Sequence, residues 1–198
     1  MAFFSSWVHG SNVRPEWVHD NLQPVRGATW DSNNEDRDVP WSDVNGLPRG
    51  WGATFRGKRS FSGGLFGAST IGPFDPADPY RDNQKGYWFH FSIPTPVIVF
   101  DVRSKLLRVF VLWDASDHVS VDVVHVYDGP SRIAVFGVNP ASGSHCGAGG
   151  HADLVDGVTK FDLSPAPDVL WGIGVSVGVS FQQDGDITFC SAGADFEV

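Results

Sequence analysis

The residues of this sequence best suited to binding or catalysis are tryptophan–histidine pairs with a constant spacing. They occur as Trp7-Val8-His9, Trp17-Val18-His19 and Trp88-Phe89-His90. In an extended chain, residues two apart point to the same side, so each pair would present an indole and an imidazole together. Imidazole binds metals and transfers protons near neutral pH, and an indole face packs against apolar surfaces and sugar-like rings. The spacing therefore predicts paired binding or catalytic groups on strands.

Three histidines fall in stretches with strand character, and each has an aromatic residue two positions away. The pairs are His9 with Trp7, His90 with Trp88, and His125 with Tyr127. If the three imidazoles converged, they would form a site for one divalent metal ion, as in cupin-like enzymes. The alternative is that each histidine is half-buried and hydrogen-bonded to a neighbour, with the rings as packing. His19 follows Pro15 in a polar stretch, so we expect it at the end of a segment.

Two other motifs are weaker. Residues 52–59, GATFRGKR, approach a phosphate-binding loop, but Arg59 stands where Ser or Thr should hold magnesium, and the neighbours favour a strand. Residues 144–156 contain ligands that suit zinc or copper, namely His145, Cys146, His151, Asp153 and Asp156. Their spacing matches no standard zinc module, and we interpret this segment as a loop.

The elements that must position these groups are predicted to be strands. Residues 169–181 alternate strictly, with large apolar residues at odd positions and mainly Gly or Ser at even positions. This pattern predicts a long strand with one buried face. Repeated glycine on the other face indicates that a backbone, an aromatic ring or a ligand lies close against it.

Other stretches also favour strands, and none shows helical periodicity. They are 2–9, 53–62, 88–93, 97–102, 106–113, 119–129, 131–138, 158–163 and 187–191. The apolar phase switches between Val123 and Val124, which predicts a bulge or a strand that crosses between sheets. Asp128-Gly129 predicts a hairpin turn. We expect an all-β fold with one domain over residues 1–198, a jelly-roll-like β-sandwich or, alternatively, a closed antiparallel β-barrel, with long loops at 20–50, 71–86 and 139–157.

The charge composition argues against two classes of partner. A formal net charge of −9 and a pI near 5.0 argue against nucleic acid or an anionic membrane, since both attract positive charge. No apolar run predicts a membrane span, and the first residues lack the features of a secretory signal. We therefore predict a soluble cytoplasmic protein in which Cys146 and Cys190 are free thiols rather than a disulfide.

Several motifs occur together in a familiar order: WVHG at 7–10, FRGK at 55–58, WFHFSIPTPVIV at 88–99, VHVYDG at 124–129, WGIGVSVGVSF at 171–181 and SAGADF at 191–196. In this combination the chain resembles a family of small β-rich bacterial and fungal proteins with no known activity. The resemblance implies one β domain and includes His9, His90 and His125 as pattern positions, but not His19.

Two functions of different classes follow. The first is a non-catalytic binding or assembly module, in which Trp7 and Trp88, with Trp30 or Trp41, recognise a small-molecule or carbohydrate ligand. The second is a small β-barrel enzyme, a cyclase, isomerase or metal-dependent lyase. It would use the His9, His90 and His125 cluster, with His90, His125 and Tyr127 as catalytic groups. The sequence favours the binding module, because no catalytic motif is complete, and leaves a homo-oligomer open.

Overall fold

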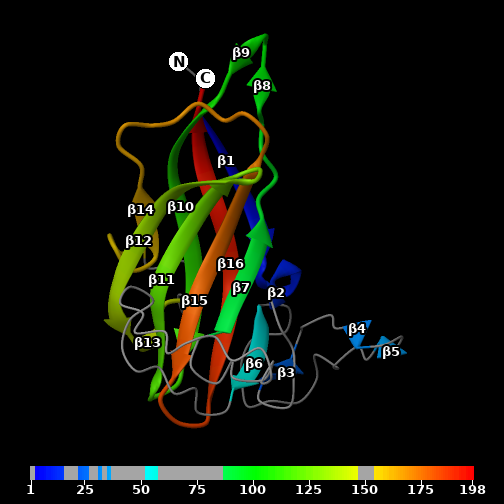
Figure 1. Ribbon diagram of the computed structural model, residues 1–198, viewed down its shortest axis with the longest axis vertical. Coiled ribbons are helices and arrows are strands. Elements are labelled where there is room, and N and C mark those ends of the chain that lie inside the picture. The colour runs from blue at the N-terminus through cyan, green and yellow to red at the C-terminus, as the bar shows by residue number, and fades with distance from the viewer. Residues whose placement is uncertain are drawn as a thin grey trace, which may run out of the picture.

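The described elements are β-strands and one 3₁₀ turn (Figure 1). The structure is a computed structural model that describes residues 3–15, 22–26, 31–32, 35–36, 52–57, 87–146 and 154–198. The elements are β1 (Phe3–His9), η1 (Gly10–Asn12), β2 (Arg14–Pro15), β3 (Leu22–Arg26), β4 (Asp31–Ser32), β5 (Glu35–Asp36), β6 (Ala53–Gly57), β7 (Tyr87–Ser92), β8 (Ile98–Val99), β9 (Val102–Arg103), β10 (Lys105–Ala115), β11 (Val119–Asp128), β12 (Ser131–Ala141), β13 (Gly143–Ser144), β14 (Lys160–Asp162), β15 (Ile173–Phe181) and β16 (Gly185–Glu197).

Two antiparallel sheets form the body of the fold. Sheet A has seven strands in the order β13-β10-β16-β6-β3, with β14 also paired to β10 and β1 also paired to β16. Sheet B has five strands in the order β12-β11-β15-β7-β2. The chain passes repeatedly between the sheets; β10 in sheet A is followed directly by β11 in sheet B. These layers confirm the all-β prediction and fit a sandwich, whereas the finer jelly-roll assignment stays a prediction.

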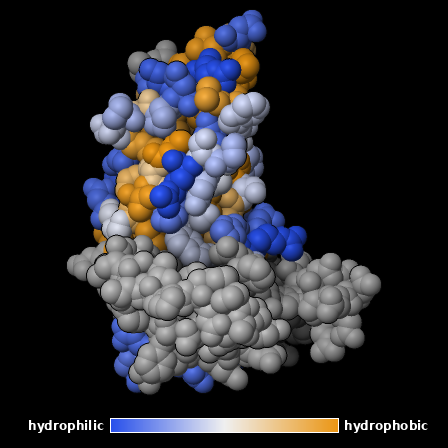
Figure 2. All heavy atoms as spheres, viewed as in Figure 1, coloured by the Kyte–Doolittle hydropathy of each residue, from blue (hydrophilic) through white to orange (hydrophobic). Residues whose placement is uncertain are grey.

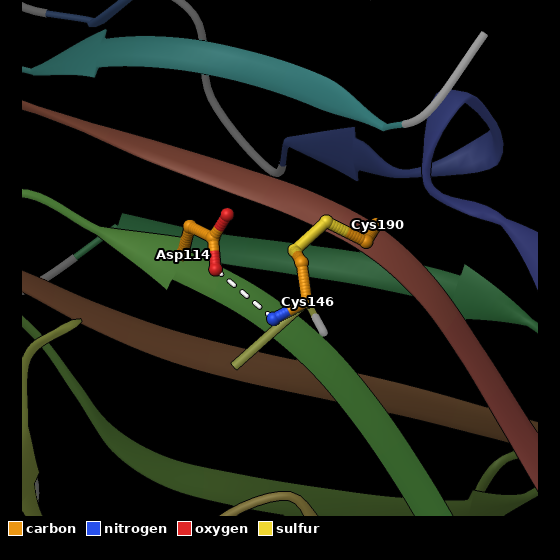
Figure 3. Close-up of side chains that lie close together, drawn as sticks. All are labelled: Asp114, Cys146 and Cys190. Carbon is orange, nitrogen blue, oxygen red and sulfur yellow. Dashed lines mark hydrogen bonds between the residues drawn. A yellow bond between two sulfur atoms is a disulfide. The ribbon is translucent and has the colours of Figure 1, made fainter. Parts of the chain in front are cut away.

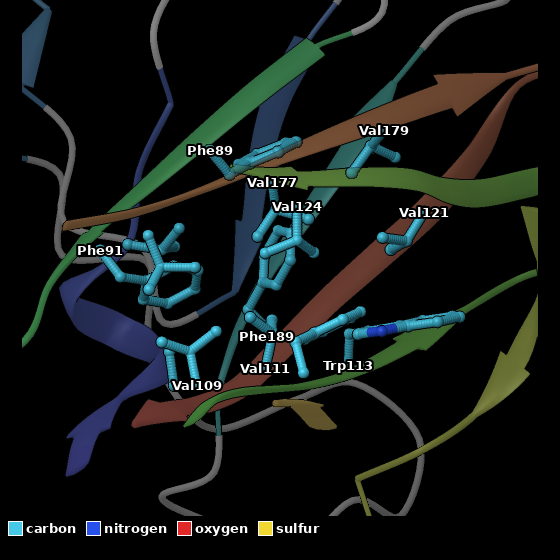
Figure 4. Close-up of a cluster of buried hydrophobic side chains, with 14 of the residues drawn as sticks. Phe89, Phe91, Val109, Val111, Trp113, Val121, Val124, Val177, Val179 and Phe189 are labelled. Atoms are coloured by element: carbon cyan, nitrogen blue, oxygen red, sulfur yellow. The ribbon is translucent and has the colours of Figure 1, made fainter. Parts of the chain in front are cut away.

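The core lies between the two sheets and receives side chains from both (Figure 4). On β15, the odd-numbered residues face this core as predicted, and Val175, Val177 and Val179 are fully buried. From sheet A, β10 contributes Trp113, also fully buried, and β16 contributes Phe189. Truncating such an aromatic residue to alanine costs about 3–5 kcal/mol, so these side chains hold the sheets together.

The local predictions for β11 are confirmed. Its pairing with β15 shifts between Val121 and Val123, which places a bulge at Asp122, close to the predicted phase switch. The Asp122 carboxylate accepts hydrogen bonds from the hydroxyls of Ser120 and Ser180, and these bonds hold the bulge. The hairpin to β12 turns at Gly129, whose φ of 56° suits glycine.

Two strand predictions are wrong. Residues 97–102 do not form one buried strand: the chain reverses at Phe100 and Asp101, whose φ angles are positive, and β8 pairs back on β9. The apolar side chains of this hairpin are exposed, Phe100 by 89%. Likewise β15 begins only at Ile173, so residues 169–172 precede the strand.

The prediction of two free thiols is also wrong. Cys146 and Cys190 form a disulfide with a Cα–Cα distance of 5.8 Å. β16 continues from Gly185 to Glu197 and brings Cys190 beside the segment after β13, a proximity that strand patterns do not reveal. Among the described residues, no helix is long and apolar enough to cross a membrane. The predicted loop at 71–86, most of the one at 20–50 and residues 147–153 of the one at 139–157 lie outside the described residues. The start of the loop predicted at 139–157 is wrong, because β12 continues to Ala141 and β13 follows at Gly143–Ser144.

Candidate functional site

The outward face of sheet B is built around the small residues of β15. Gly174, Ser176, Gly178 and Ser180 alternate with the buried valines and therefore point away from the core. Figures 1 and 2 view the molecule from the side of sheet B, and in Figure 2 polar and apolar residues interleave on it. Because small side chains occupy the middle strand, larger groups on both neighbouring strands can lean over it.

The strand register determines which side chains flank β15. His90 of β7 and His125 of β11 lie opposite Ser176, one on each side. Ser92 and Tyr127 lie opposite Gly174 in the same way, and Trp88 lies opposite Gly178. Because directly paired residues share a face, all of these side chains are on the outer surface of sheet B.

These side chains contact one another across β15. The rings of Trp88 and His125 come from strands about 10 Å apart, yet their centroids are 4.7 Å apart. The His125 and Tyr127 centroids are 6.3 Å apart. On the other side, His90 Nδ1 and Ser176 Oγ form a hydrogen bond of 2.8 Å, which leaves Ser176 only 6% exposed. An aromatic ring is thus one of the neighbours that the glycine pattern predicted.

The electrostatics of this face favour a neutral His125. Burial, and secondarily the positive charge of Arg132, lower the pKa of His125 from its ordinary value of 6.5. Arg132 lies opposite Tyr127, and Arg14 of β2 lies opposite His90 at the other edge. Neither arginine forms an ion pair within the described part of the chain. The face therefore joins aromatic rings, neutral hydrogen-bonding groups and two available guanidinium groups.

A shallow hollow of about 440 Å³ opens at the end of sheet B where β15 begins. Its lining includes Ser92, Thr95, Gly129, Trp171, Gly172 and Gly174. The Trp171 side chain is 72% exposed. Because Ser92 and Gly174 share the row of Tyr127, the hollow continues the line of rings formed by Tyr127, His125 and Trp88.

Trp171 is exposed and yet firmly held. Its backbone N–H donates a 2.8 Å hydrogen bond to Asp128, which also accepts from the backbone N–H groups of Leu170 and Gly172. Burial acts to raise the pKa of Asp128, but these three bonds and Arg103 outweigh it, so the pKa lies below its ordinary value. The Trp171 side chain also packs on Gly129, where any added Cβ would lie 2.8 Å from it.

The structure brings together only some of the predicted site residues. Trp88, His90, His125 and Tyr127 share the outer face of sheet B, whereas Trp7 and His9 lie on β1 in sheet A. His9 is therefore on the opposite side of the sandwich, and the three histidines do not form one metal site. Trp30, Trp41 and His19 lie outside the described residues. Within the described ranges, the one group with metal-ligand spacing is Asp114, Cys146 and Cys190.

Trp171 is the site residue that sequence reasoning missed, because its odd number placed it in the buried phase of a strand that was predicted to start at 169. A signal was present: Leu170 is large although it falls in the phase that is otherwise Gly or Ser. That break in alternation marks the true start of β15, after which the buried phase is regular.

The comparisons with known proteins give a family but no activity. No curated protein and no solved structure matches the chain. A family model matches residues 58–191, which is more than half of the chain and includes β7 through most of β16. The chain therefore belongs to the family of unknown function DUF6623.

Proposed function

We propose that this protein is a non-catalytic binding module that recognises a sugar-like ligand on the outer face of sheet B. The observation that carries the proposal is Trp171, an indole that is 72% exposed although its backbone and Cβ are fixed by Asp128 and Gly129. Large exposed aromatic side chains that are held rigidly mark binding surfaces, because little conformational entropy is lost when a ligand stacks on them.

The surroundings of Trp171 favour a sugar over a purely apolar ligand. The hollow beside it has the hydroxyl of Ser92, which is exposed, and the backbone of three glycines in its lining. Sugars combine an apolar ring face with many hydroxyl groups, so they need an aromatic platform with polar groups around it. Tyr127, His125 and His90 extend this combination along the sheet.

The first test is binding of the full-length protein to a panel of neutral and acidic polysaccharides, measured by affinity electrophoresis. We expect at least one polysaccharide to retard the wild type. Trp171→Ala should weaken that binding by about tenfold, since the loss of one stacking ring is worth about 1.4 kcal/mol. Trp7→Ala is the matched control, because Trp7 lies on sheet A and its loss should leave affinity unchanged.

Three outcomes would contradict the proposal. The first is that no polysaccharide binds, and the second is that the two tryptophan variants lose affinity equally. The third is that no sugar binds but an apolar fluorescent dye does, and that Trp171→Ala abolishes binding of the dye. The last outcome would assign the hollow to an apolar small ligand. Thermal melting of both variants checks that each is folded at the temperature of the assay.

A second candidate is a small enzyme that uses His90, His125 and Tyr127, and the observation in its favour is the hydrogen bond between His90 and Ser176. A hydroxyl bonded to an imidazole is the starting arrangement for nucleophilic or acid–base catalysis. Ser176 is only 6% exposed, which argues against attack on a bulky substrate. Ser176→Ala distinguishes the two: a binding module keeps its affinity, whereas an enzyme loses turnover.

A further inference from the structure

The disulfide lies beside a carboxylate on the outer side of sheet A, far from the proposed ligand face. Cys190 belongs to β16, Cys146 follows β13, and Asp114 is on β10 between them (Figure 3). One ligand atom from each of the three residues, the two sulfurs and a carboxylate oxygen, lies within 4.8 Å of the other two. This trio combines the ligand types that zinc prefers, thiolate sulfur with a hard oxygen.

Asp114 is held in place by three hydrogen bonds to one of its oxygens. Oδ1 accepts from Ser144 Oγ at 2.7 Å, from the backbone N–H of His145 at 2.8 Å and from that of Cys146 at 3.0 Å. These bonds fix the segment that carries Cys146 to β10 independently of the disulfide. Cys146 and Cys190 would therefore remain neighbours after reduction. Because all three bonds go to Oδ1, the other carboxylate oxygen of Asp114, Oδ2, is left for another partner.

His145 follows Ser144, whose hydroxyl bonds to Asp114 on the outer face, so its side chain points the other way. Its ring packs on Trp113 of the core, with centroids 4.3 Å apart. The candidate ligands are therefore Asp114 and the two cysteine sulfurs.

We propose that reduction of the Cys146–Cys190 disulfide opens a zinc site formed by the two thiolates and Asp114. A dithiol reductant supplies two electrons and two protons; the S–S bond breaks, two thiols form, and the reductant becomes a cyclic disulfide. Zn²⁺ then displaces one proton from each thiol and forms two Zn–S bonds and one bond to the carboxylate. Water completes the four positions. The metal thus replaces the covalent link, so this part of sheet A stays fastened in both redox states.

The test measures zinc binding by the untagged full-length protein in competition with a chromophoric chelator. Protein reduced with a phosphine should bind one zinc ion per chain, and oxidised protein should bind none. Asp114→Asn keeps an oxygen that accepts the three hydrogen bonds but removes the charge. We expect it to weaken zinc affinity by about tenfold or more, since even outer partners of metal ligands change affinity by about 10–100-fold.

Two control variants isolate the site. The double variant Cys146→Ser with Cys190→Ser should bind no zinc, and Asp162→Asn, which changes an exposed carboxylate on β14, should bind as the wild type does. The proposal is overturned if the reduced wild type binds no zinc or if the double serine variant binds as much. If the reduced chain loses its native tryptophan fluorescence, recovery with one equivalent of zinc supports the site, and no recovery overturns it.

Discussion

The outer faces of the two sheets carry the same Trp-x-His spacing and use it differently. On sheet A, Trp7 of β1 reaches across Gly193 of β16 and stacks on Phe110 of β10, with ring centroids 5.0 Å apart and planes 16° from parallel. On sheet B, Trp88 reaches across β15 to His125 at 4.7 Å. In both cases a tryptophan meets a ring from two strands away over a middle strand with glycine.

The partner ring decides what each arrangement can do. Phe110 is 3% exposed and cannot titrate or hydrogen-bond, so the contact on sheet A is packing. His125 is only partly buried and lies in line with Tyr127 and the hollow at Trp171. In both sheets the Trp-x-His motif places a tryptophan ring over the middle strand. The ring contributed by the strand beyond it then decides whether the contact is packing or part of a candidate site.

The charged side chains of the two outer faces also differ, in whether they form ion pairs within the described residues. On sheet A they form ion pairs: Arg108 lies 3.3 Å from Asp162 and 3.6 Å from Asp195, and Arg56 forms a two-point contact with Asp186. Such exposed pairs contribute little stability, but they leave few free groups for a ligand. On sheet B, Arg14 and Arg132 have no ion pair within the described ranges. We infer that sheet A fastens the fold and sheet B presents the site.

The largest expected effect comes from removing the covalent fastening on sheet A. The disulfide joins residues 44 apart, and closing a loop of this length stabilises a fold by about 4 kcal/mol. The double serine variant should therefore lose about this much free energy of unfolding in urea, without zinc or reductant. Its affinity for a polysaccharide should be unchanged under conditions where it is folded. A loss of affinity in the folded variant would show that the two faces are coupled.

Two glycine variants, one on each sheet, are expected to have effects of intermediate size. At Gly193, an added Cβ would lie 2.6 Å from the Trp7 ring and 2.8 Å from the Ser6 backbone oxygen. Gly193→Ala should therefore destabilise the protein by about 2 kcal/mol, since both the indole and the backbone of β1 must move. It should not change ligand affinity.

Gly174→Ala on sheet B should do the opposite. Its Cβ would make only ordinary contacts, 3.8 Å and 3.9 Å from the nearest atoms. Alanine in a strand should leave the stability unchanged or raise it by about 0.5 kcal/mol. Because Gly174 lines the hollow, the added methyl group should weaken ligand binding. If both variants affected stability alone, sheet B would be packing like sheet A.

The sequence was sufficient for the all-β class because strands are recognised by local alternation. The buried phase of β15, the bulge in β11 and the turn at Gly129 all depend on residues close together in the chain, and each was predictable. The hairpin at 97–102 was not, because Phe100 and Asp101 adopt positive φ angles that non-glycine residues seldom show.

The site was less predictable because it depends on which strands are neighbours. Trp88, His90, His125 and Tyr127 were chosen by their spacing, but spacing cannot show that β15 separates them or that β1 lies in the other sheet. The disulfide depends in the same way on two distant segments meeting at the edge of β10. Strand order is a property of the whole chain, and it separated His9 from its predicted partners.

The smallest expected effect is the contribution of His125 to the pH dependence of stability. It tests whether this ring does more than pack against its neighbours. Because the folded state holds its pKa below 6.5, the unfolded chain takes up the proton first as the pH falls. Stability from this group is complete above the ordinary pKa, falls as the pH drops through it, and stops falling below the folded pKa.

His125→Phe keeps a ring against Trp88 and cannot titrate. The urea midpoint of the wild type should therefore fall more between about pH 7 and about pH 5 than that of His125→Phe. Arg132→Gln should give an intermediate slope, since it removes only the secondary, charge-based cause of the shift. Equal slopes for the wild type and His125→Phe would mean that His125 is as inert on sheet B as Phe110 is on sheet A.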